Sequence, residues 1–359
     1  MRYQTYVHER NWGARLTEFE YRGYAMVSLE NRFLRIVIAA GKGTDIVEFL
    51  YKPLDVDFMW RSYAGLRAGH NFHPTIANPN GSFIDFYTGG WQEMLPNAGA
   101  NCTYKGAALG VHGEVCLLPW SYHIVTNSPD KVVVTFYVRA IRTPFYVEKT
   151  FWINEEDPTL HIEELVRNEA DEPMDFMWGH HLAFGWPFID ESCRIFLPSC
   201  RVRTPEDYTA PNSRLERGQD NEWPLVRGRN GESVNLSRIP PPEVRSHDMA
   251  YMHDMQDGWY ALVSGSRGAG FGLYWEKGTF PFLWFWQLYR GGMGYPWFGT
   301  SYTAALEPVS SYPQTLTEAI KANSQLVLAG GEERRTSLAA AAFAGRNEVR
   351  GINADGKVY

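Results

Sequence analysis

Residues 132–138 read VVVTFYV, residues 145–153 read FYVEKTFWI, and residues 160–168 read LHIEELVRN. Each run is rich in β-branched and aromatic residues, which favour extended strands. The segments between them contain Pro, Asp and Asn, which are typical of turns. Strands at this spacing predict an antiparallel all-β sandwich or barrel.

The rest of the chain continues this pattern. Residues 32–38 are expected to form a hairpin with residues 44–51, because a Gly-containing turn separates two apolar runs. Helical periodicity is scarce, and residues 315–322 are the best helix candidate. The alanine-rich residues 337–343 are compatible with a helix, whereas residues 349–359 favour a closing strand. We therefore expect a large antiparallel β-sandwich with little helix.

The 359 residues are expected to form a single domain, because large all-β folds often exceed 200 residues. The segment 204–242 interrupts the strand pattern with six prolines and many charged residues. Strand signals of the same kind resume after it, so we expect a long surface excursion within the domain. Long loops in compact domains are often functional, and this one is interpreted as a flap beside a binding cleft.

The composition narrows the choice of function. The formal net charge is -7 and the pI is about 5.8, which argues against nucleic acid as a partner. No run of about 18 apolar residues predicts a membrane span, and residues 1–13 lack the apolar core of a secretory signal. We expect a cytoplasmic monomer or homodimer in which Cys102, Cys116, Cys193 and Cys200 are buried thiols.

Two adjacent histidines, His180 and His181, follow a strand-like run within the segment WGHHLAFGWP of residues 178–187. Neighbouring residues of a strand point to opposite faces, so only one of the two can face a given cleft. For the same reason they cannot easily bind one metal ion together. Far downstream, Glu307 ends another strand-like run before Pro308. A histidine and a carboxylate are common partners for moving two protons.

Three further segments carry polar side chains among aromatic residues. Residues 89–99 read GGWQEMLPNAG, residues 110–114 read GVHGE, and residues 284–290 read WFWQLYR. The chain has 13 Trp and 20 Tyr, which favours an aromatic surface that stacks on a polyhydroxylated ligand such as a sugar. Taken singly, each segment also fits an ordinary role as a turn, a loop or a core strand.

In this order and spacing, these motifs resemble those of the aldose 1-epimerases, the galactose mutarotase-like proteins. The resemblance extends from about residue 28 to residue 343 and implies a large β-sandwich of the supersandwich type. It also implies interconversion of the anomers of a free hexose or hexose derivative. His181 then resembles the general acid at the ring oxygen, Glu307 the general base at the anomeric hydroxyl, and His112 a second histidine that polarises sugar oxygens.

The resemblance also implies residues that bind the sugar. Asp248 is the first choice and Asp254 the second for an acidic residue that contacts sugar hydroxyls, and Trp178 or Trp297 are possible further cleft walls. The expected substrate-binding residues are Trp91, Glu93, Asn97, His180, Asp248, Trp286, Gln287 and Arg290. Ala98 stands where many relatives have an arginine after the asparagine, which places the chain in a divergent branch.

Neither a metal nor a cofactor is expected, because the sequence has no nucleotide-binding loop of the usual glycine pattern. Two alternatives remain open at this point. The first is a non-catalytic carbohydrate-binding or sugar-sensing protein on the same fold, since a fold does not determine a function. The second is an epimerase of a phosphorylated or sulfonated sugar, with Arg67 or Arg290 as the anion clamp.

Overall fold

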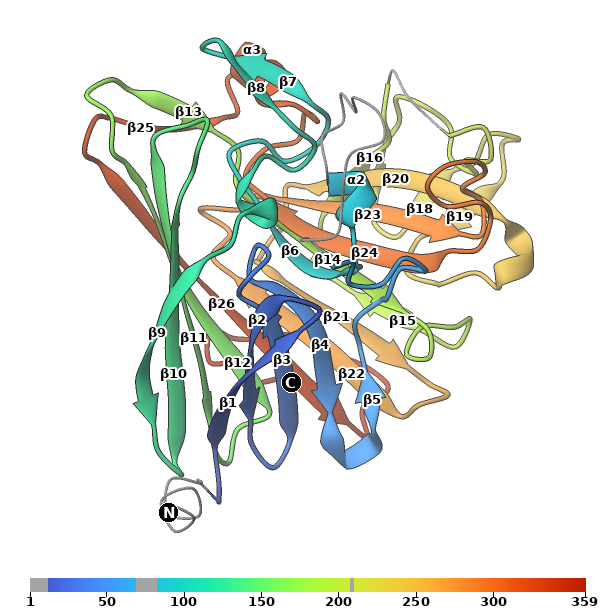
Figure 1. The fold of residues 1–359 in the computed structure, drawn as a ribbon. Coiled ribbons are helices and arrows are strands. Elements are labelled where there is room, and N and C mark those ends of the chain that lie inside the picture. Colours follow the sequence, from blue (N-terminus) through green and yellow to red (C-terminus); the bar gives the residue numbers. More distant parts are fainter. Residues whose placement is uncertain (1–11, 69–82, 207–209) are drawn as a thin grey trace, which may run out of the picture.

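The structure is a computed structural model that describes residues 12–68, 83–206 and 210–359. Most of the start segment, in which we expect no secretory signal, lies outside these ranges. The described chain is built mainly from two antiparallel sheets (Figure 1). The larger sheet contains β1 (Arg15–Tyr21), β2 (Tyr24–Glu30), β3 (Leu34–Ala39), β4 (Asp45–Tyr51), β5 (Val56–Asp57), β6 (Gly90–Met94), β14 (Gly179–Gly185), β16 (Arg201–Arg203), β17 (Asp220–Glu222), β20 (Ser246–His253), β23 (Phe282–Tyr289) and β24 (Tyr302–Val309). The smaller sheet contains β9 (Ser121–Asn127), β10 (Lys131–Arg139), β11 (Phe145–Asn154), β12 (Thr159–Asn168), β15 (Arg194–Phe196), β21 (Trp259–Ser264), β22 (Ala269–Trp275) and β26 (Glu333–Ala344).

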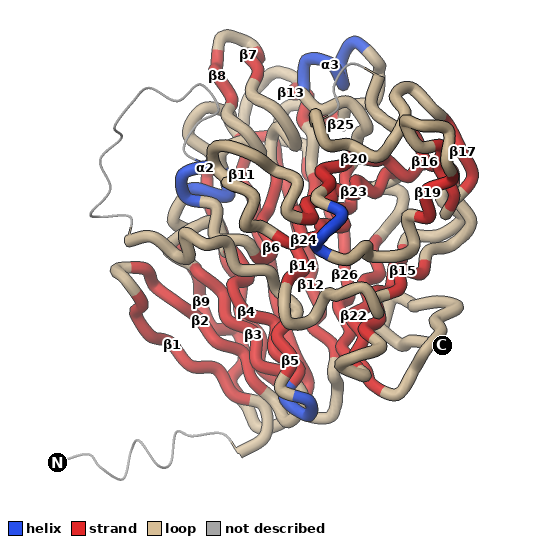
Figure 2. Tube along the Cα trace, turned by 90° about the vertical axis from the view of Figure 1, so that its right-hand side faces the viewer, coloured by secondary structure: helices blue, strands red, loops and turns tan. Residues whose placement is uncertain are grey.

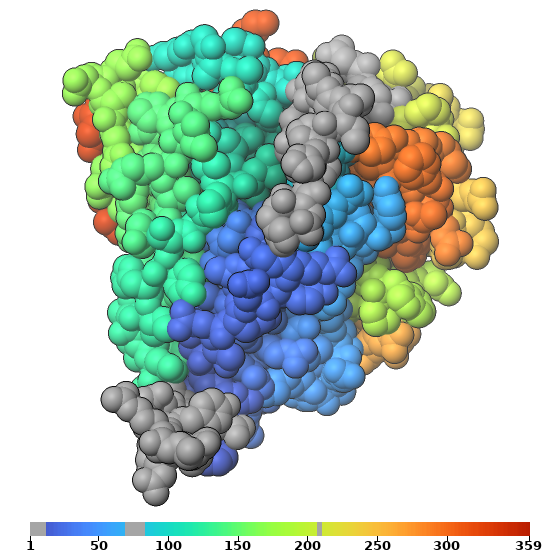
Figure 3. Space-filling model, in the orientation of Figure 1, coloured from blue at the N-terminus to red at the C-terminus, as the bar shows by residue number. Residues whose placement is uncertain are grey.

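Both sheets mix strands from distant parts of the sequence. The larger sheet has the order β1-β2-β3-β4-β6-β14-β24-β23-β20-β16-β17, and β5 pairs with β4. The smaller has the order β15-β21-β22-β26-β12-β11-β10-β9. In the space-filling view the N-terminal strands, in blue, lie directly against the green residues of the middle of the chain (Figure 3). The predicted hairpin is present as β3 and β4.

The inner faces of the two sheets meet in an aromatic core. Phe271 of the smaller sheet lies 5.2 Å from Phe49 and 5.0 Å from Phe184 of the larger sheet, measured between ring centroids. All three side chains are fully buried. Side chains from both inner faces interdigitate in this way in β-sandwiches, so the predicted fold class is confirmed.

The described chain also contains three smaller strand pairs and short helices, of which α3 lies at the top of the molecule (Figure 2). The pairs are β7 (Cys102–Tyr104) with β8 (Ala107–Leu109), β13 (Met174–Phe176) with β25 (Leu326–Leu328), and β18 (Leu225–Arg227) with β19 (Ser233–Asn235). The helices are α2 (Phe83–Phe86), α3 (Leu316–Lys321), and the 3-10 turns η1 (Lys52–Leu54), η3 (Val115–Leu117) and η4 (Pro242–Val244). None of the helices in the described ranges is long and apolar enough to cross a membrane.

The helix expected near residue 315 is present as α3, where Thr315 and Glu318 form a capping box. The alanine-rich residues 337–343 are a strand instead of a helix, because β26 pairs on both sides, with β12 and with β22. Alanine suits a central strand that is covered by its neighbours. The expected closing strand at residues 349–359 is reduced to a bridge between Ile352 and Val358.

The four cysteines are free thiols, as predicted, although Cys102 is only partly buried. The described part of the segment 204–242 is not a bare loop, since it contributes β17, β18 and β19.

Candidate active site

His181 on β14 and Glu307 on β24 lie opposite one another on the same face of the larger sheet. Ala183 pairs with Ala305, and two residues further along these antiparallel strands the register places His181 beside Glu307. Nε2 of His181 is 3.5 Å from Oε1 of Glu307. The two side chains are only 5% and 2% exposed. The sheet register therefore builds a histidine–carboxylate pair from residues far apart in sequence.

His112 reaches the same place from a loop. Its backbone is left-handed, with φ of 59°, a conformation that is uncommon outside glycine and often found at functional sites. Gly113 beside it packs so closely on Leu95 that a Cβ would lie 2.1 Å from the carbonyl oxygen. The ring centroids of His112 and His181 are 5.0 Å apart. His112, His181 and Glu307 therefore lie close together in the structure.

The three side chains line a cavity of about 310 Å³ on the outer face of the larger sheet. This volume lies at the lower end of the range for small-molecule sites and suits a ligand of monosaccharide size. Three tryptophans supply most of its aromatic wall, and Trp286 and Trp297 lie 5.3 Å apart. The lining residues are Phe83, Ile84, Tyr87, Gly99, Ala100, Val111, His112, His181, His247, Met249, Trp284, Trp286, Trp297, Glu307 and Gln314.

Burial keeps the titratable groups of this cavity uncharged. Burial raises the pKa of Glu307 well above its usual value of 4.5. Burial, together with the neighbouring His112, lowers the pKa of His181 well below 6.5. Burial also lowers the pKa of His112 to about 4. Burial therefore favours the uncharged form of the His181–Glu307 pair, in which one proton lies on the carboxyl group.

Each histidine has a hydrogen-bond partner that bears on its protonation. Nδ1 of His112 donates to the carbonyl oxygen of Ala98, so the lone pair of its Nε2 is free to accept. Nδ1 of His181 lies 3.3 Å from the hydroxyl oxygen of Tyr87. Nε2 of His181 faces Glu307, so the imidazole lies between the Tyr87 hydroxyl and the carboxyl group with which it can exchange a proton.

Several residues expected in this cleft lie inside the sandwich instead. Trp91 and Trp178 are buried between the sheets, where the indole N–H of Trp91 donates to Nδ1 of His180 and that of Trp178 donates to Glu93. His180 faces the interior because it alternates with His181 along β14. The corrections for Trp91, Trp178, Glu93 and His180 have one cause: these side chains project from the opposite face of the sheet.

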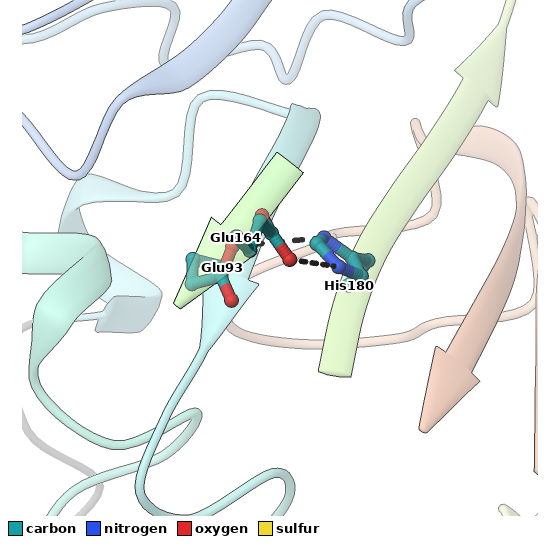
Figure 4. Close-up of side chains that lie close together, drawn as sticks. All are labelled: Glu93, Glu164 and His180. Atoms are coloured by element: carbon teal, nitrogen blue, oxygen red, sulfur yellow. Dashed lines mark ion pairs between the residues drawn. The ribbon is translucent and has the colours of Figure 1, made fainter. Parts of the chain in front are cut away.

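The interior residues form a charged network. The ammonium group of Lys149 pairs with Glu93, and it lies 3.3 Å from Glu164. Nε2 of His180 lies 3.1 Å from Glu164 (Figure 4). Burial and Glu164 raise the pKa of Glu93. Burial opposes ionisation of Glu164, but His180 and Lys149 outweigh burial and keep its pKa below its usual value.

This network also has the geometry of a metal site. Glu93, Glu164 and His180 each offer a ligand atom, and the three atoms lie within 4.8 Å of one another. Lys149 already contacts both carboxylates and supplies the compensating positive charge. The charges of this ionic network are therefore paired with one another, although the two carboxylate oxygens of Glu164 and Nε2 of His180 have no hydrogen-bond partner among the described residues.

Asp248 and Gln287 are also turned away from the cavity. They are paired across β20 and β23 and project from the face opposite that of Trp286. Asp248 accepts from Arg214 at 2.7 Å, and Gln287 accepts from the same guanidinium at 2.9 Å. Arg214 belongs to the segment 204–242, none of whose described residues lines the cavity. The interpretation of this segment as a flap over the cleft is therefore not supported for its described part.

The remaining expected contacts lie outside the cavity as well. The amide of Asn97 donates to the carbonyl oxygens of Ala100 and Gly110, so it fastens the loop that carries His112. Arg290 is exposed at the end of β23, and Asp254 is exposed beside His253. Of the expected binding residues, Trp286 lines the cavity, together with the alternative wall Trp297.

The cavity residues that escaped the sequence analysis include Trp284, His247, Tyr87 and Gln314. Strand alternation could have identified Trp284 and His247. Trp284 is two residues from Trp286 and so faces the same side, and His247 is next to Asp248, which faces the interior. Tyr87 and Gln314 lie outside the strands, beside α2 and before α3. No periodic pattern reports the direction of such side chains.

A larger hollow of about 580 Å³ lies over β1–β4 on the same sheet. Its charged residues pair with one another, as in the contacts of Glu48 with Arg35 and Arg61. Its described lining contains no histidine. Size alone does not identify the site, because another hollow, lined by residues such as Arg201 and His253, is larger still at about 690 Å³; the chemistry of the His181–Glu307 pair favours the smaller cavity.

The chain belongs to the family described as Domain of unknown function (DUF4432), whose model matches residues 21–341. No curated protein is significantly similar to it in sequence.

Solved structures with the same fold include a candidate aldose 1-epimerase from Klebsiella pneumoniae, with a TM-score of 0.71 and 13% identity, covering 94% of this chain and 89% of that protein. A galactose mutarotase-like protein from Clostridium acetobutylicum has a TM-score of 0.67 and 13% identity, with coverages of 93% and 100%. A galactose mutarotase related enzyme from Lactobacillus acidophilus has a TM-score of 0.58 and 16% identity, with coverages of 93% and 100%. The fold is that of the galactose mutarotase-like proteins, as predicted.

Proposed function

We propose that this member of the DUF4432 family is an aldose 1-epimerase that interconverts the α and β anomers of a free hexose or hexose derivative. The observation that carries the proposal is the His181–Glu307 pair, 3.5 Å apart in a cavity walled by tryptophans. A pair that can give and take a proton at the same site is what anomer interconversion requires.

The reaction moves two protons. One leaves the anomeric hydroxyl O1 and another is added to the ring oxygen O5, so the C1–O5 bond breaks and an aldehyde forms. Rotation about the C1–C2 bond presents the other face of the carbonyl group. Ring closure then reverses both transfers and yields the other anomer. His181 and Glu307 supply and accept these protons without a net change of charge.

Both proton distributions of the pair occur in each turnover. If His181 donates to O5 and Glu307 accepts from O1, ring opening moves the pair's proton from the histidine to the carboxyl group. Ring closure moves it back. Because burial favours the uncharged pair, the form that accompanies the open-chain sugar is also the resting form. Before ring opening, the proton therefore passes from Glu307 to His181 within the pair.

The other cavity residues position the sugar. The free lone pair on Nε2 of His112 accepts a hydroxyl hydrogen, since its Nδ1 is engaged with Ala98. Trp286 and Trp297 offer faces to the C–H surface of a pyranose ring. These contacts hold C1 and O5 within reach of the catalytic pair.

The alternative of an anionic sugar has less support. Neither Arg67 nor Arg290 is among the residues that line the cavity, and the described lining has no lysine or arginine. The alternative of a non-catalytic sugar-binding protein shares the same cavity but makes no use of the proton shared by His181 and Glu307.

Polarimetry on a panel of freshly dissolved anomers tests the proposed function. We expect faster mutarotation of at least one free aldose than in buffer alone, at a rate proportional to protein concentration. Binding of a sugar without any acceleration across the panel would favour the non-catalytic alternative. Acceleration confined to phosphorylated or sulfonated sugars would favour the anionic alternative.

A further inference from the structure

His247 lies on the wall of the proposed catalytic cavity and has no role in the proton transfers. It is the second residue of β20, and its side chain points to the same side as Trp286 of the neighbouring strand β23. The ring centroids of His247 and Trp286 are 6.1 Å apart, at an interplanar angle of 76°. His247 and His181 therefore reach the same cavity from different strands.

The contact with Trp286 determines which nitrogen of His247 carries hydrogen. The indole N–H of Trp286 donates to Nε2 of His247 at 2.8 Å. A nitrogen that accepts a hydrogen bond carries no proton, so the imidazole is neutral and its hydrogen is on Nδ1. Burial also lowers the pKa of His247, although Asp248 opposes this effect. Among the described residues, no hydrogen-bond partner is found for Nδ1 of His247.

His247 and His112 therefore present opposite polarities. His112 has a free acceptor nitrogen because its Nδ1–H is bonded to Ala98. His247 has a free donor because its Nε2 accepts from Trp286. A sugar hydroxyl is both donor and acceptor, so it can satisfy either ring. Neither ring is charged, and the described lining has no lysine or arginine. The two histidines therefore suit a neutral hydroxyl group better than an anionic group.

We propose that His247 is a specificity-determining residue, whose Nδ1–H donates a hydrogen bond to one hydroxyl oxygen of an uncharged aldose. This inference rests on the proposed function for the identity of the ligand. Trp286 acts through His247 as a positioning residue, because its indole N–H holds the imidazole in the donor form. The hydroxyl that is read lies away from O1 and O5, which face His181 and Glu307.

Binding of single-deoxy sugars tests this role without requiring turnover. The probes are the aldose that binds best and its analogues that each lack one hydroxyl group, with Kd followed by tryptophan fluorescence. In the wild type, one analogue should bind about 3- to 10-fold more weakly than the parent sugar, which is the value of one neutral hydrogen bond. In His247→Phe the parent sugar should bind as weakly as that analogue, so that the difference disappears. His247→Gln should restore part of it, because the amide again offers an N–H donor.

The outcomes separate this inference from the proposed function. If His247→Phe discriminates among the analogues as the wild type does, or if the 6-phosphate of the parent sugar binds more tightly than the parent, His247 does not read a neutral hydroxyl. If the discrimination is lost but no sugar is ever mutarotated, His247 keeps its role and the enzyme assignment fails. If mutarotation is observed while the discrimination is unchanged, the enzyme assignment stands and the role of His247 fails. If no sugar binds, both fail.

Discussion

His180 and His181 are neighbours in sequence but belong to two regions with opposite electrostatics. His180 points into the sandwich, where Lys149, Glu93 and Glu164 form a network of paired charges. His181 points into the cavity, where burial keeps it and Glu307 uncharged. The charged groups inside the sandwich form ion pairs with one another. The His181–Glu307 pair of the cavity has no neighbouring cation among the described lining residues and can instead share a proton.

The difference separates stability from reactivity. Buried charges are tolerated when each one is paired, and removing one partner leaves the other uncompensated. Burial of a carboxyl group without a nearby cation favours its protonated, neutral form. Such a group cannot serve as a fixed negative charge, but it can donate and accept a proton. We therefore expect replacements in the interior network to affect folding, and replacements in the cavity to affect turnover.

The largest effect is expected for Lys149→Met. This change leaves Glu93 and Glu164 buried without a cation and should lower the free energy of unfolding by about 3–5 kcal/mol. Chemical denaturation followed by circular dichroism measures this loss. Lys131→Met, at a partly exposed site of β10, is the matched control and should change stability little. Equal stability of the Lys149 variant and the wild type would mean that the network is not the ionic cluster described here.

Replacing each of the two histidines by asparagine compares the regions directly. His181→Asn should lower kcat at least about 100-fold, the lower range for loss of a positioned proton donor or acceptor. His180→Asn should instead lower the free energy of unfolding by about 1–3 kcal/mol, because the buried indole N–H of Trp91 loses its acceptor, and its folded fraction should retain most of the activity. Mutarotation rates measured beside thermal melts separate the two effects. The reverse pattern would invert the assignment of the two faces.

The pH dependence should reflect a pair that carries one proton. The pair loses this state in acid when His181 also binds a proton, and in alkali when Glu307 releases its own. Because the pKa of His181 lies well below 6.5, the acid limb of kcat/KM should lie well below pH 6.5, and because burial raises the pKa of Glu307, the alkaline limb should lie well above pH 4.5. Initial rates at low sugar concentration measure this profile. Half-maximal activity at pH 6.5 on an acid limb would indicate an unperturbed histidine.

The smallest effect is an increase in stability for Glu307→Gln at neutral pH. A group whose pKa is raised in the folded state stabilises the fold below its unfolded pKa, near 4.5, and this contribution is lost as pH rises through the folded pKa. Glutamine does not ionise, so the variant should melt about 2 °C higher at pH 7, and the difference should vanish near pH 4. Melting curves at the two pH values test this. A lower melting temperature at pH 7 would mean that the ionised carboxylate is stabilised in the cavity.

Strand alternation predicted the most from the sequence. It placed His180 and His181 on opposite faces, and the register of β14 with β24 then placed Glu307 beside His181. Alternation does not show which face is the cleft, because both faces of β14 are buried. Asp248 and Gln287 were therefore assigned to the wrong face of the sheet. Their sequence neighbours His247 and Trp286 are the residues that line the cavity.

Other errors have different physical causes. Glu93 was expected to bind hydroxyls because it lies in the polar and aromatic segment 89–99, but its ion-pair partner Lys149 comes from a strand of the other sheet. A sequence pattern within one strand cannot report such a contact. Tyr87 and Gln314 lie beside short helices, where side-chain direction depends on tertiary packing.

Exchange NMR at anomeric equilibrium tests the catalytic role of the His181–Glu307 pair most directly. The sample contains an aldose that binds the protein, with either wild-type protein or Glu307→Gln at the same concentration. We predict exchange between the α and β resonances with the wild type, and an exchange rate at least about 100-fold lower with the variant, which still binds the sugar and gives an unchanged circular dichroism spectrum. Exchange as fast with Glu307→Gln as with the wild type would contradict this account.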